Sequence, residues 1–408
     1  MKLSVATNFE PDLLDALAGF PVAELFGKLP ADPVGGGRAS FMLSPLSVRA
    51  FRDHVRSAAQ RGIGFNYLIN PACMDNREYT RQGQADLERL LELVVECGVS
   101  SVTVSLPFLL SIVKKRYPAL TVRVGVYARV DCVVKARFWE DLGADCITLE
   151  SIAVNRDFAM LEAIRRSVGL ELQLIANSNC LMFCPLSGHH MVNLSHASQS
   201  RHASRGFMID YCALNCSSQK LADPSHYLRS EFIRPEDLGI YRALGYDSFK
   251  ILERGAPTPI MAERVRAYSR GSFDGNLLDL IQPYGYKART RGKGNSGMFL
   301  KYFFRPGTVD LAGLLRLKKL AEKRGLLAPV SGDPVYIDNR QLDGFLAGMQ
   351  EIDCRSRDCT ACGYCAAWSA RAVRVDERYR TELLALYAET FDQMHSGGLW
   401  GIGRKRTS

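Results

Sequence analysis

The sequence predicts an α/β protein built as a (β/α)8 TIM-like barrel with a small cysteine-rich extension at its C-terminal end. The barrel is predicted because eight short β-branched runs alternate with helical patterns over residues 1–273, which matches a (β/α)8 barrel in count and length. The extension is predicted because a dense group of cysteines follows these repeating units. A doubly wound open sheet is the alternative architecture for the same alternation.

The predicted strands are short and rich in β-branched residues: Leu3–Thr7, Val22–Phe26, Phe65–Ile69, Val102–Ser105, Val122–Tyr127, Cys146–Glu150, Leu172–Ala176 and Ser248–Leu252. Between them, apolar residues recur at helical spacing, as in Asp86–Cys97. The other predicted helices of this part are Pro11–Leu17, Val48–Gln60, Phe108–Lys115, Lys135–Leu142, Phe158–Val168, Pro235–Leu244 and Pro259–Tyr268. Gly98, Gly143 and Gly245 follow helices and suit helix C-termini.

One connection is much longer than the others, and it divides the predicted barrel. Residues 177–231 form an insertion after the seventh strand, and connections of this length in compact domains are usually functional. Residues 274–335 are predicted as a basic, irregular connecting region. Residues 336–408 are predicted as a small C-terminal domain with helices at Asn339–Ile352 and Glu377–Gln393.

Composition and charge are typical of a globular protein. Apolar residues make up 47% of the chain and charged residues 23%. No apolar run reaches the roughly 18 residues that span a bilayer, and the N-terminus lacks a signal peptide's apolar core, so we expect a cytoplasmic protein without a membrane partner. The net charge of +9 is concentrated at residues 287–305 and 404–406, which favours a solvated basic surface over one nucleic-acid-binding stripe.

Twelve cysteines in a cytosolic chain suggest metal binding or redox chemistry, because disulfides are disfavoured there. A first group, Cys180, Cys184, Cys212 and Cys216, lies in the insertion. Residues four apart share one face of a helical turn, so each Cys-x3-Cys pair is expected to present two thiolates in one direction. Zinc sites more often use Cys-x2-Cys spacing, so a [4Fe–4S] cluster is favoured and a structural zinc ion is the alternative.

The second cysteine group lies in the C-terminal domain. Cys354, Cys359, Cys362 and Cys365 have the dense spacing of ferredoxin-like or zinc-ribbon sites. Cys-x2-Cys-x2-Cys is more typical of iron–sulfur sites, so a second [4Fe–4S] cluster is favoured over structural zinc or free thiols.

Polar residues at the ends of the predicted strands are the candidates for catalysis and substrate binding, because these ends meet at one mouth of a barrel. Glu150 and Arg254 are the predicted catalytic pair, as a base or anchor and an anion clamp. The predicted substrate-binding residues are Arg129, Asn177, Asn179 and Glu253. The alternative is that these side chains satisfy loop backbone groups. We find no serine or cysteine protease arrangement, and no Gly-x-Ser-x-Gly elbow occurs.

Two stretches resemble the collagenase-like peptidase family U32 over about residues 1–270. The run from Arg234 to Leu238, followed by residues 250–254, resembles that family's helix and its Lys-Ile-Glu-Gly-Arg signature, although Leu252 and Glu253 depart from the Glu-Gly order. The run Asn177-x-Asn179-Cys180-x3-Cys184-Pro185 resembles the cysteine segment after the family's seventh strand. The four-cysteine spacing differs from that of the best-known members, which indicates a divergent iron–sulfur branch.

The resemblance implies a redox function. Cluster-bearing members of the family support oxygen-independent hydroxylation of ubiquinone precursors or of RNA bases, with prephenate implicated as the oxygen source. By this resemblance the first cysteine group holds the four-iron cluster facing the substrate. Arg254, Lys250 or Arg129 is then expected to bind an anionic co-substrate such as prephenate.

We therefore expect an oxygen-independent hydroxylase, or a related iron–sulfur redox enzyme, that acts on a small molecule or an RNA base. The chain has no recognisable RNA-binding module, which favours the small molecule. A metal-dependent, collagenase-like peptidase is the first alternative. The second is a non-catalytic accessory or electron-transfer subunit that carries a cluster and pairs with a homologous partner or an electron donor.

Overall fold

The computed structural model describes residues 1–253, 255–281, 308–326, 330 and 332–402, and in it eight parallel strands form a closed barrel. Neighbours pair in chain order, and β8 pairs with β1 to close the ring. The strands are β1 (Lys2–Ala6), β2 (Val22–Gly27), β3 (Gly64–Ile69), β4 (Ser101–Val104), β5 (Thr121–Val124), β6 (Cys146–Thr148), β7 (Glu171–Ile175) and β8 (Ser248–Ile251). The predicted (β/α)8 barrel is confirmed, and each predicted strand overlaps an observed one.

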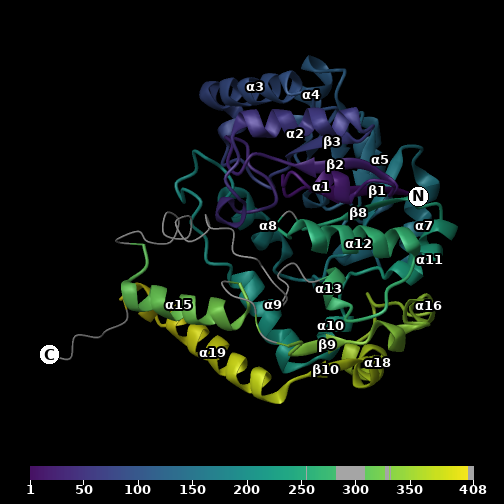
Figure 1. Cartoon of the computed structure of the whole chain (residues 1–408), viewed down its shortest axis with the longest axis vertical. Coiled ribbons are helices and arrows are strands. Elements are labelled where there is room, and N and C mark those ends of the chain that lie inside the picture. Colours follow the sequence, from purple (N-terminus) through teal and green to yellow (C-terminus); the bar gives the residue numbers. More distant parts are fainter. Residues whose placement is uncertain (254, 282–307, 327–329, 331, 403–408) are drawn as a thin grey trace.

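Helices alternate with the strands and cover the barrel (Figure 1). They are α1 (Leu13–Ala16), α2 (Val48–Gln60), α3 (Arg81–Glu96), α4 (Pro107–Arg116), α5 (Val133–Asp141), α6 (Ser151–Val154), α7 (Phe158–Ser167), α11 (Leu238–Ala243) and α12 (Thr258–Arg270). Each predicted helix of the barrel overlaps one of them. Helix α3 begins at Arg81 rather than at Asp86, because the Thr80 side chain accepts a hydrogen bond from the Gly83 N–H and caps the helix.

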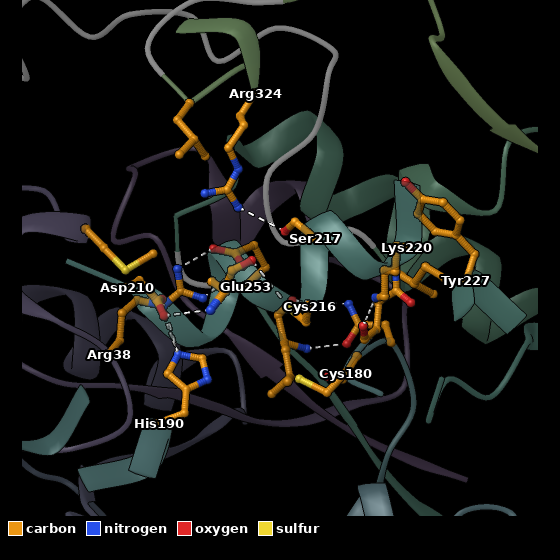
Figure 2. Close-up of a pocket in the computed structure, with 18 of the residues that line it drawn as sticks. Arg38, Cys180, His190, Asp210, Cys216, Ser217, Lys220, Tyr227, Glu253 and Arg324 are labelled. Atoms are coloured by element: carbon orange, nitrogen blue, oxygen red, sulfur yellow. Dashed lines mark hydrogen bonds and ion pairs between the residues drawn. The ribbon is translucent and has the colours of Figure 1, made fainter. Parts of the chain in front are cut away.

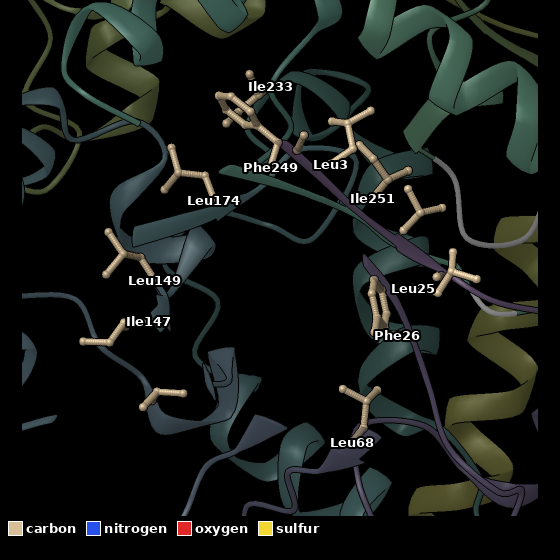
Figure 3. Packing of buried hydrophobic residues seen from close by; sticks show 14 of the residues in the cluster. Leu3, Leu25, Phe26, Leu68, Ile147, Leu149, Leu174, Ile233, Phe249 and Ile251 are labelled. Atoms are coloured by element: carbon tan, nitrogen blue, oxygen red, sulfur yellow. The ribbon is translucent and has the colours of Figure 1, made fainter. Parts of the chain in front are cut away.

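The outer face of the barrel is apolar. Alternate residues of a strand point to opposite faces, and in a barrel one of those faces meets the helices. Leu3 and Phe249 are paired in register on β1 and β8, and both are fully buried, as are Leu25 and Leu174 (Figure 3). Each such side chain contributes roughly 1.5–3 kcal/mol by leaving water, so this layer holds strands and helices together.

The interior of the barrel is polar toward the N-terminal ends of the strands. Arg123 on β5 pairs with Glu24 on β2 at 2.9 Å and with Glu171 on β7 at 3.0 Å, although these strands are not neighbours. Burial raises the pKa of Glu171, but the hydrogen bonds and charges of Arg123 and Lys2 outweigh it and lower that pKa to about 2. Because side chains fill this end, a ligand site is expected at the opposite, C-terminal end.

The insertion after β7 is folded and carries α8 (Ser187–His196), α9 (Tyr211–Ala222) and α10 (Ser225–Leu228). Isolated bridges tie it to the barrel loops, since Asp32 pairs with Gln199. Its ends are tied to each other by a bridge between Leu181 and Ser230. The insertion therefore starts and ends at the mouth of the barrel.

The C-terminal part is a small mixed unit. Its elements are α13 (Leu278–Ile281), α15 (Leu311–Lys323), β9 (Val335–Ile337), η5 (Asn339–Leu342), α16 (Phe345–Met349), α17 (Cys359–Cys362), α18 (Tyr364–Ala372), β10 (Val373–Val375), α19 (Glu377–His395) and η6 (Gly398–Trp400). The prediction of one helix at Asn339–Ile352 is wrong: Gly344 takes a φ of +86° and separates η5 from α16. The predicted helix at Glu377–Gln393 is confirmed as α19.

Contacts with the barrel and the insertion hold the C-terminal part in place. Arg234 is buried; its Nη1 donates to the Asn339 carbonyl oxygen at 2.8 Å, while its Nε pairs with Asp237 at 2.7 Å. Helix α19 packs against α9 and α15 (Figure 1). The basic segments at 287–305 and 404–406 lie outside the described residues. None of the helices that the structure describes is long and apolar enough to span a membrane.

Candidate functional site

A cavity of about 250 Å³ lies where the barrel mouth, the insertion and the C-terminal helices meet (Figure 2). Its wall includes residues from the loop after β7, from α9 and from α19. The charged and histidine side chains of the wall are Arg38, His190, Asp210, Lys220, Glu253, Arg264 and Arg324. Tyr227, Tyr379 and Tyr387 add aromatic surface. A concave site with apolar walls and a few convergent polar groups is the usual form of a small-molecule site.

The first cysteine group lies at this cavity. Cys180 and Cys216 form part of its wall, and the Cys216 thiol interacts electrostatically with those of Cys180, Cys184 and Cys212. Cys212 and Cys216 lie one turn apart on α9, as their spacing predicts. The same prediction is wrong for Cys180 and Cys184, which lie on irregular chain where Phe183 takes a φ of +53°.

Burial and a neighbouring lysine both affect the thiols of the first cysteine group. Burial raises the pKa of Cys180 well above its ordinary value, and the exposed part of the residue lines the cavity. Burial likewise raises the pKa of Cys212 to about 12. The buried Lys220 ammonium donates to the Asn179 carbonyl oxygen and interacts with the Cys216 and Cys180 thiols (Figure 2). The Lys220 cation therefore lies beside the thiols of the first cysteine group.

The first cysteine group has the donor atoms for two kinds of metal group. Among the residues that the structure describes, no three His, Cys, Asp or Glu side chains lie close enough to share one metal ion. A zinc ion binds each thiolate at about 2.3 Å, so it needs four sulfur atoms nearly in contact. An iron–sulfur cube is larger and holds its thiolates farther apart. Four thiolates are the ligand set of either a zinc ion or a [4Fe–4S] cluster.

The predicted catalytic pair is only partly described. The carboxylate of Glu150 is buried and accepts a hydrogen bond from the Arg129 Nε at 3.0 Å. Burial raises the pKa of Glu150, and the adjacent Arg129 only partly offsets this. The structure thus brings Glu150 and Arg129 together, but neither lines the cavity. Arg254 lies outside the described residues.

The other predicted binding residues divide into two sets. Asn177, Asn179 and Glu253 line the cavity. The Asn177 side chain bonds to the backbone of Leu252, whereas both amide atoms of the buried Asn179 side chain lack a partner among the described residues. Lys250 pairs in register with Ser4, whose side chain points into the barrel, and its Nζ lies 4.2 Å from the centre of the Phe26 ring. Asn179 is therefore the predicted residue best placed to bind a ligand.

Sequence reasoning missed Arg38, which forms a bidentate ion pair with Glu253. The Arg38 Nη1 lies 2.7 Å from the Glu253 Oε1, and its Nη2 lies 2.8 Å from Oε2. Glu253 has a φ of +101°, a conformation that favours glycine. No local motif marks Arg38, Arg264 or Arg324, because they come from three separate segments. Only the fold brings them to one wall.

The second cysteine group lies outside the cavity wall. Cys359 and Cys362 are on α17, Cys365 is in the first turn of α18, and Cys354 precedes both helices. The Cys354 thiol interacts electrostatically with those of Cys359, Cys362 and Cys365. The structure therefore gathers all four cysteines that the sequence grouped together.

Similarity to known proteins extends over most of the chain. The model of Peptidase family U32 matches residues 43–274. An uncharacterized protease of Methanocaldococcus jannaschii is 27% identical over 342 residues, which cover 84% of this chain and 86% of the relative. Among solved structures, the U32 peptidase Mk0906 is 23% identical with a TM-score of 0.47, covering 63% of this chain and 93% of its own. Phosphoribosyl anthranilate isomerase from Thermus thermophilus is 15% identical with a TM-score of 0.36, covering 66% of this chain and 98% of its own. Because the family model spans more than half of the chain, the protein belongs to peptidase family U32.

Proposed function

We propose that this chain is an iron–sulfur enzyme that carries out an oxygen-independent hydroxylation, or a related redox step, in the cavity at the barrel mouth. The observation that carries the proposal is the position of Cys180 and Cys216, which belong both to the first cysteine group and to the cavity wall. A cluster held by this group supplies one-electron chemistry beside whatever the cavity binds. The other groups of the wall bind and orient the substrate.

The cavity is suited to one ring with a polar edge. Its volume of about 250 Å³ is small, and tyrosines supply aromatic surface for a flat ligand. The Asn179 amide offers a donor and an acceptor that have no partner among the described residues, so a ligand with both kinds of group satisfies them. A small aromatic molecule or a single RNA base has these features.

The cations of the wall support an anionic co-substrate of the prephenate type. Arg324 donates to the Ser217 hydroxyl at 3.1 Å and lines the cavity with Lys220 and with Arg38, whose guanidinium is already paired with Glu253 (Figure 2). These cations replace Lys250 and Arg129 in the proposal, since the latter do not line the cavity. Guanidinium groups bind carboxylates through paired hydrogen bonds, which suits a dicarboxylate oxygen donor.

The first experiment is anaerobic purification of the full chain followed by iron, sulfide and zinc analysis. Cys184→Ala is the test variant, because Cys184 belongs to the first cysteine group but not to the cavity wall. Cys97→Ala is the matched control, because Cys97 is buried at the end of α3, outside both cysteine groups. We expect iron and sulfide in the wild type and the control, with a loss of about four irons in Cys184→Ala. Zinc without sulfide in the wild type would contradict the proposal.

The second experiment tests the reaction. The cluster-loaded chain, prephenate and either tRNA or small phenolic precursors are incubated without oxygen, and products are analysed by mass spectrometry. Addition of one oxygen atom by the wild type and Cys97→Ala, but not by Cys184→Ala, supports the hydroxylase. If the wild type cleaves collagen-derived peptides and Cys184→Ala cleaves them equally well, the peptidase alternative is supported. Binding of tRNA that weakens steeply with salt identifies RNA as the substrate class.

A further inference from the structure

We propose that Cys354, Cys359, Cys362 and Cys365 hold a second iron–sulfur cluster. This cluster passes electrons to the cluster at the first cysteine group through the wall of residues between the two groups. The second site is argued from its own residues and does not depend on the proposed function. Only the electron-transfer step depends on it, because that step needs a cluster at the cavity. Four observations support the proposal.

The first observation is the local fold of the second group. Asp358 caps α17, and Gly363, with a φ of +64°, turns the chain directly into α18. This turn brings Cys359, Cys362 and Cys365 together within two short helical segments, and the Cys354 thiol interacts with all three. A Cys-x2-Cys-x2-Cys run completed by a cysteine from elsewhere in the chain is the ligand pattern of ferredoxin clusters.

The second observation is a buried cation that lacks an anionic partner. Arg156 is 2% exposed, and its Nε and Nη2 both donate to the Ser230 carbonyl oxygen, at 3.2 and 2.8 Å. Its Nη1 has no hydrogen-bond partner among the described residues, and Arg156 forms no ion pair with any of them. The rings of Phe232 and Phe345, whose centres lie 4.7 and 5.3 Å from the guanidinium carbon, offset part of the cost of burying this charge, and a nearby anion would offset more of it.

The second cysteine group could supply such an anion. The Arg156 charge interacts with Tyr241, Cys365, Asp237 and Cys354, and of these the Asp237 carboxylate is already paired with Arg234 at 2.7 Å. As neutral thiols, Cys354 and Cys365 leave the guanidinium uncompensated. Four thiolates around an iron–sulfur core carry a net negative charge, which Arg156 would neutralise.

The third observation is the wall between the two groups. Ser230, which accepts from Arg156, is followed by Glu231, whose N–H donates to the Cys180 carbonyl oxygen at 3.1 Å and whose Oε1 lies 3.4 Å from the Cys180 nitrogen. On a second route, the Arg355 guanidinium, next to Cys354, lies 5.6 Å from the centre of the Phe183 ring, next to Cys184. A few covalent bonds and contacts therefore join each group to the other.

The fourth observation is that the two cysteine groups differ in their access to an electron donor. In the second group Cys359 is exposed and the other three cysteines are partly exposed, whereas in the first group Cys212 is buried and the exposed Cys180 lines the cavity. A reduced ferredoxin or flavin protein gives one electron to the outer cluster and is itself oxidised. The outer cluster then returns to its oxidised form by passing that electron inward, so the inner cluster is reduced by one electron. No bond forms or breaks, and no proton has to move.

Iron and sulfide analysis of the anaerobically reconstituted full chain tests the site. We expect about eight irons per wild-type chain, and about four in each of Cys362→Ala and Cys184→Ala. Cys97→Ala should keep all eight. Retention of all iron by Cys362→Ala, or zinc at this group, overturns the second cluster. Loss of iron by Cys362→Ala but not by Cys184→Ala leaves the second cluster standing and refutes the proposed function instead.

Redox measurements test the contact between the clusters and the role of Arg156. In the reduced wild type, electron paramagnetic resonance should show two interacting spins, and each single-cluster variant should lose that interaction; two independent signals in the wild type overturn the shared wall. Arg156→Met should shift the potential of the outer cluster to more negative values without moving that of the inner cluster. Arg156→Lys, which keeps the charge, should restore it. An unmoved potential in Arg156→Met removes Arg156 from the site.

Stopped-flow reduction tests the direction of electron flow. With reduced ferredoxin as the donor, the inner cluster of Cys362→Ala should be reduced more slowly than that of the wild type. With dithionite, a small reductant that does not need the outer cluster, the two chains should match. Equal rates with ferredoxin overturn the relay.

Discussion

Glu253 has a backbone conformation that is costly for any residue other than glycine, and its ion pair with Arg38 offsets that cost. A left-handed conformation costs an L-residue roughly 1–2 kcal/mol, and the U32 signature has glycine at this position. The Glu253 side chain, with its φ of +101°, is 2% exposed, and the Arg38 side chain is 15% exposed. We expect Arg38→Met to destabilise the protein more than Glu253→Gly does.

The difference follows from which partner is left behind. Arg38→Met removes the bidentate partner of the buried Glu253 carboxylate, and breaking such a buried pair from one side costs about 3–5 kcal/mol. Glu253→Gly leaves a guanidinium at the cavity wall that water can reach; it also relieves roughly 1–2 kcal/mol of strain, against about 0.5–1 kcal/mol for the freedom of glycine. Because losing the ion pair costs more than the relieved strain, we expect Glu253→Gly to destabilise the protein as well, but by less than Arg38→Met does. The double variant should cost less than Arg38→Met alone.

Urea unfolding at pH 7, followed by far-ultraviolet circular dichroism, measures all three variants. Equal slopes against urea would show that the variants differ in stability rather than in compactness. Arg49→Met is the control, because its pair with Asp53 is exposed and 3.9 Å long, and should cost less than about 1 kcal/mol. A double variant whose loss equals the sum of the single losses, or a larger loss for Glu253→Gly than for Arg38→Met, would refute the reasoning.

Three further predictions concern stability. Burial lowers the pKa of His54 from 6.5 to about 4, so the unfolded chain binds more protons between these values and stability should fall by up to about 3 kcal/mol as the pH drops through this window. His54→Gln should flatten that part of a urea-derived stability profile, and an unchanged slope would contradict the assignment. Phe249→Ala, in the fully buried outer layer of the barrel, should cost about 3–5 kcal/mol, against less than about 0.5 kcal/mol for Val134→Ala, which is 78% exposed; similar urea midpoints would contradict this packing. Arg234→Met should speed hydrogen exchange in η5 and α16, and unchanged exchange there would exclude Arg234 as their anchor.

The barrel could be predicted because each of its units carries a local signal. Strand and helix periods alternate along residues 1–273, and such signals need no knowledge of distant contacts. The polar interior could not be predicted in this way. Arg123 meets Glu24 and Glu171 only because closure of the sheet brings non-neighbouring strands face to face.

In the candidate site, too, local patterns predict some residues, and the fold alone brings in others. Cysteine spacing identified both thiol groups, and the position of the insertion placed the first group at the barrel mouth. Lys250 is predicted to bind the co-substrate; its register with Ser4 directs its side chain into the barrel, and it does not line the cavity. Arg38 and Arg324 had no local signal, because each is far from Glu253 in sequence and joins it in the cavity wall only in the folded chain.

The site also bears on the choice between a redox enzyme and a peptidase. Proteolysis needs a nucleophile beside a base, or a metal-bound water. In the described part of the chain, the Thr7 hydroxyl contacts the His54 ring at 2.9 Å, but both side chains are buried and neither lines the cavity. Within the cavity, His190 pairs with Asp210 at 3.1 Å, but the nearby Cys212 thiol has a pKa of about 12 and is a poor nucleophile at neutral pH. A cluster held at Cys180 and Cys216 would stand beside any ligand bound in this cavity, as the proposed redox reaction requires.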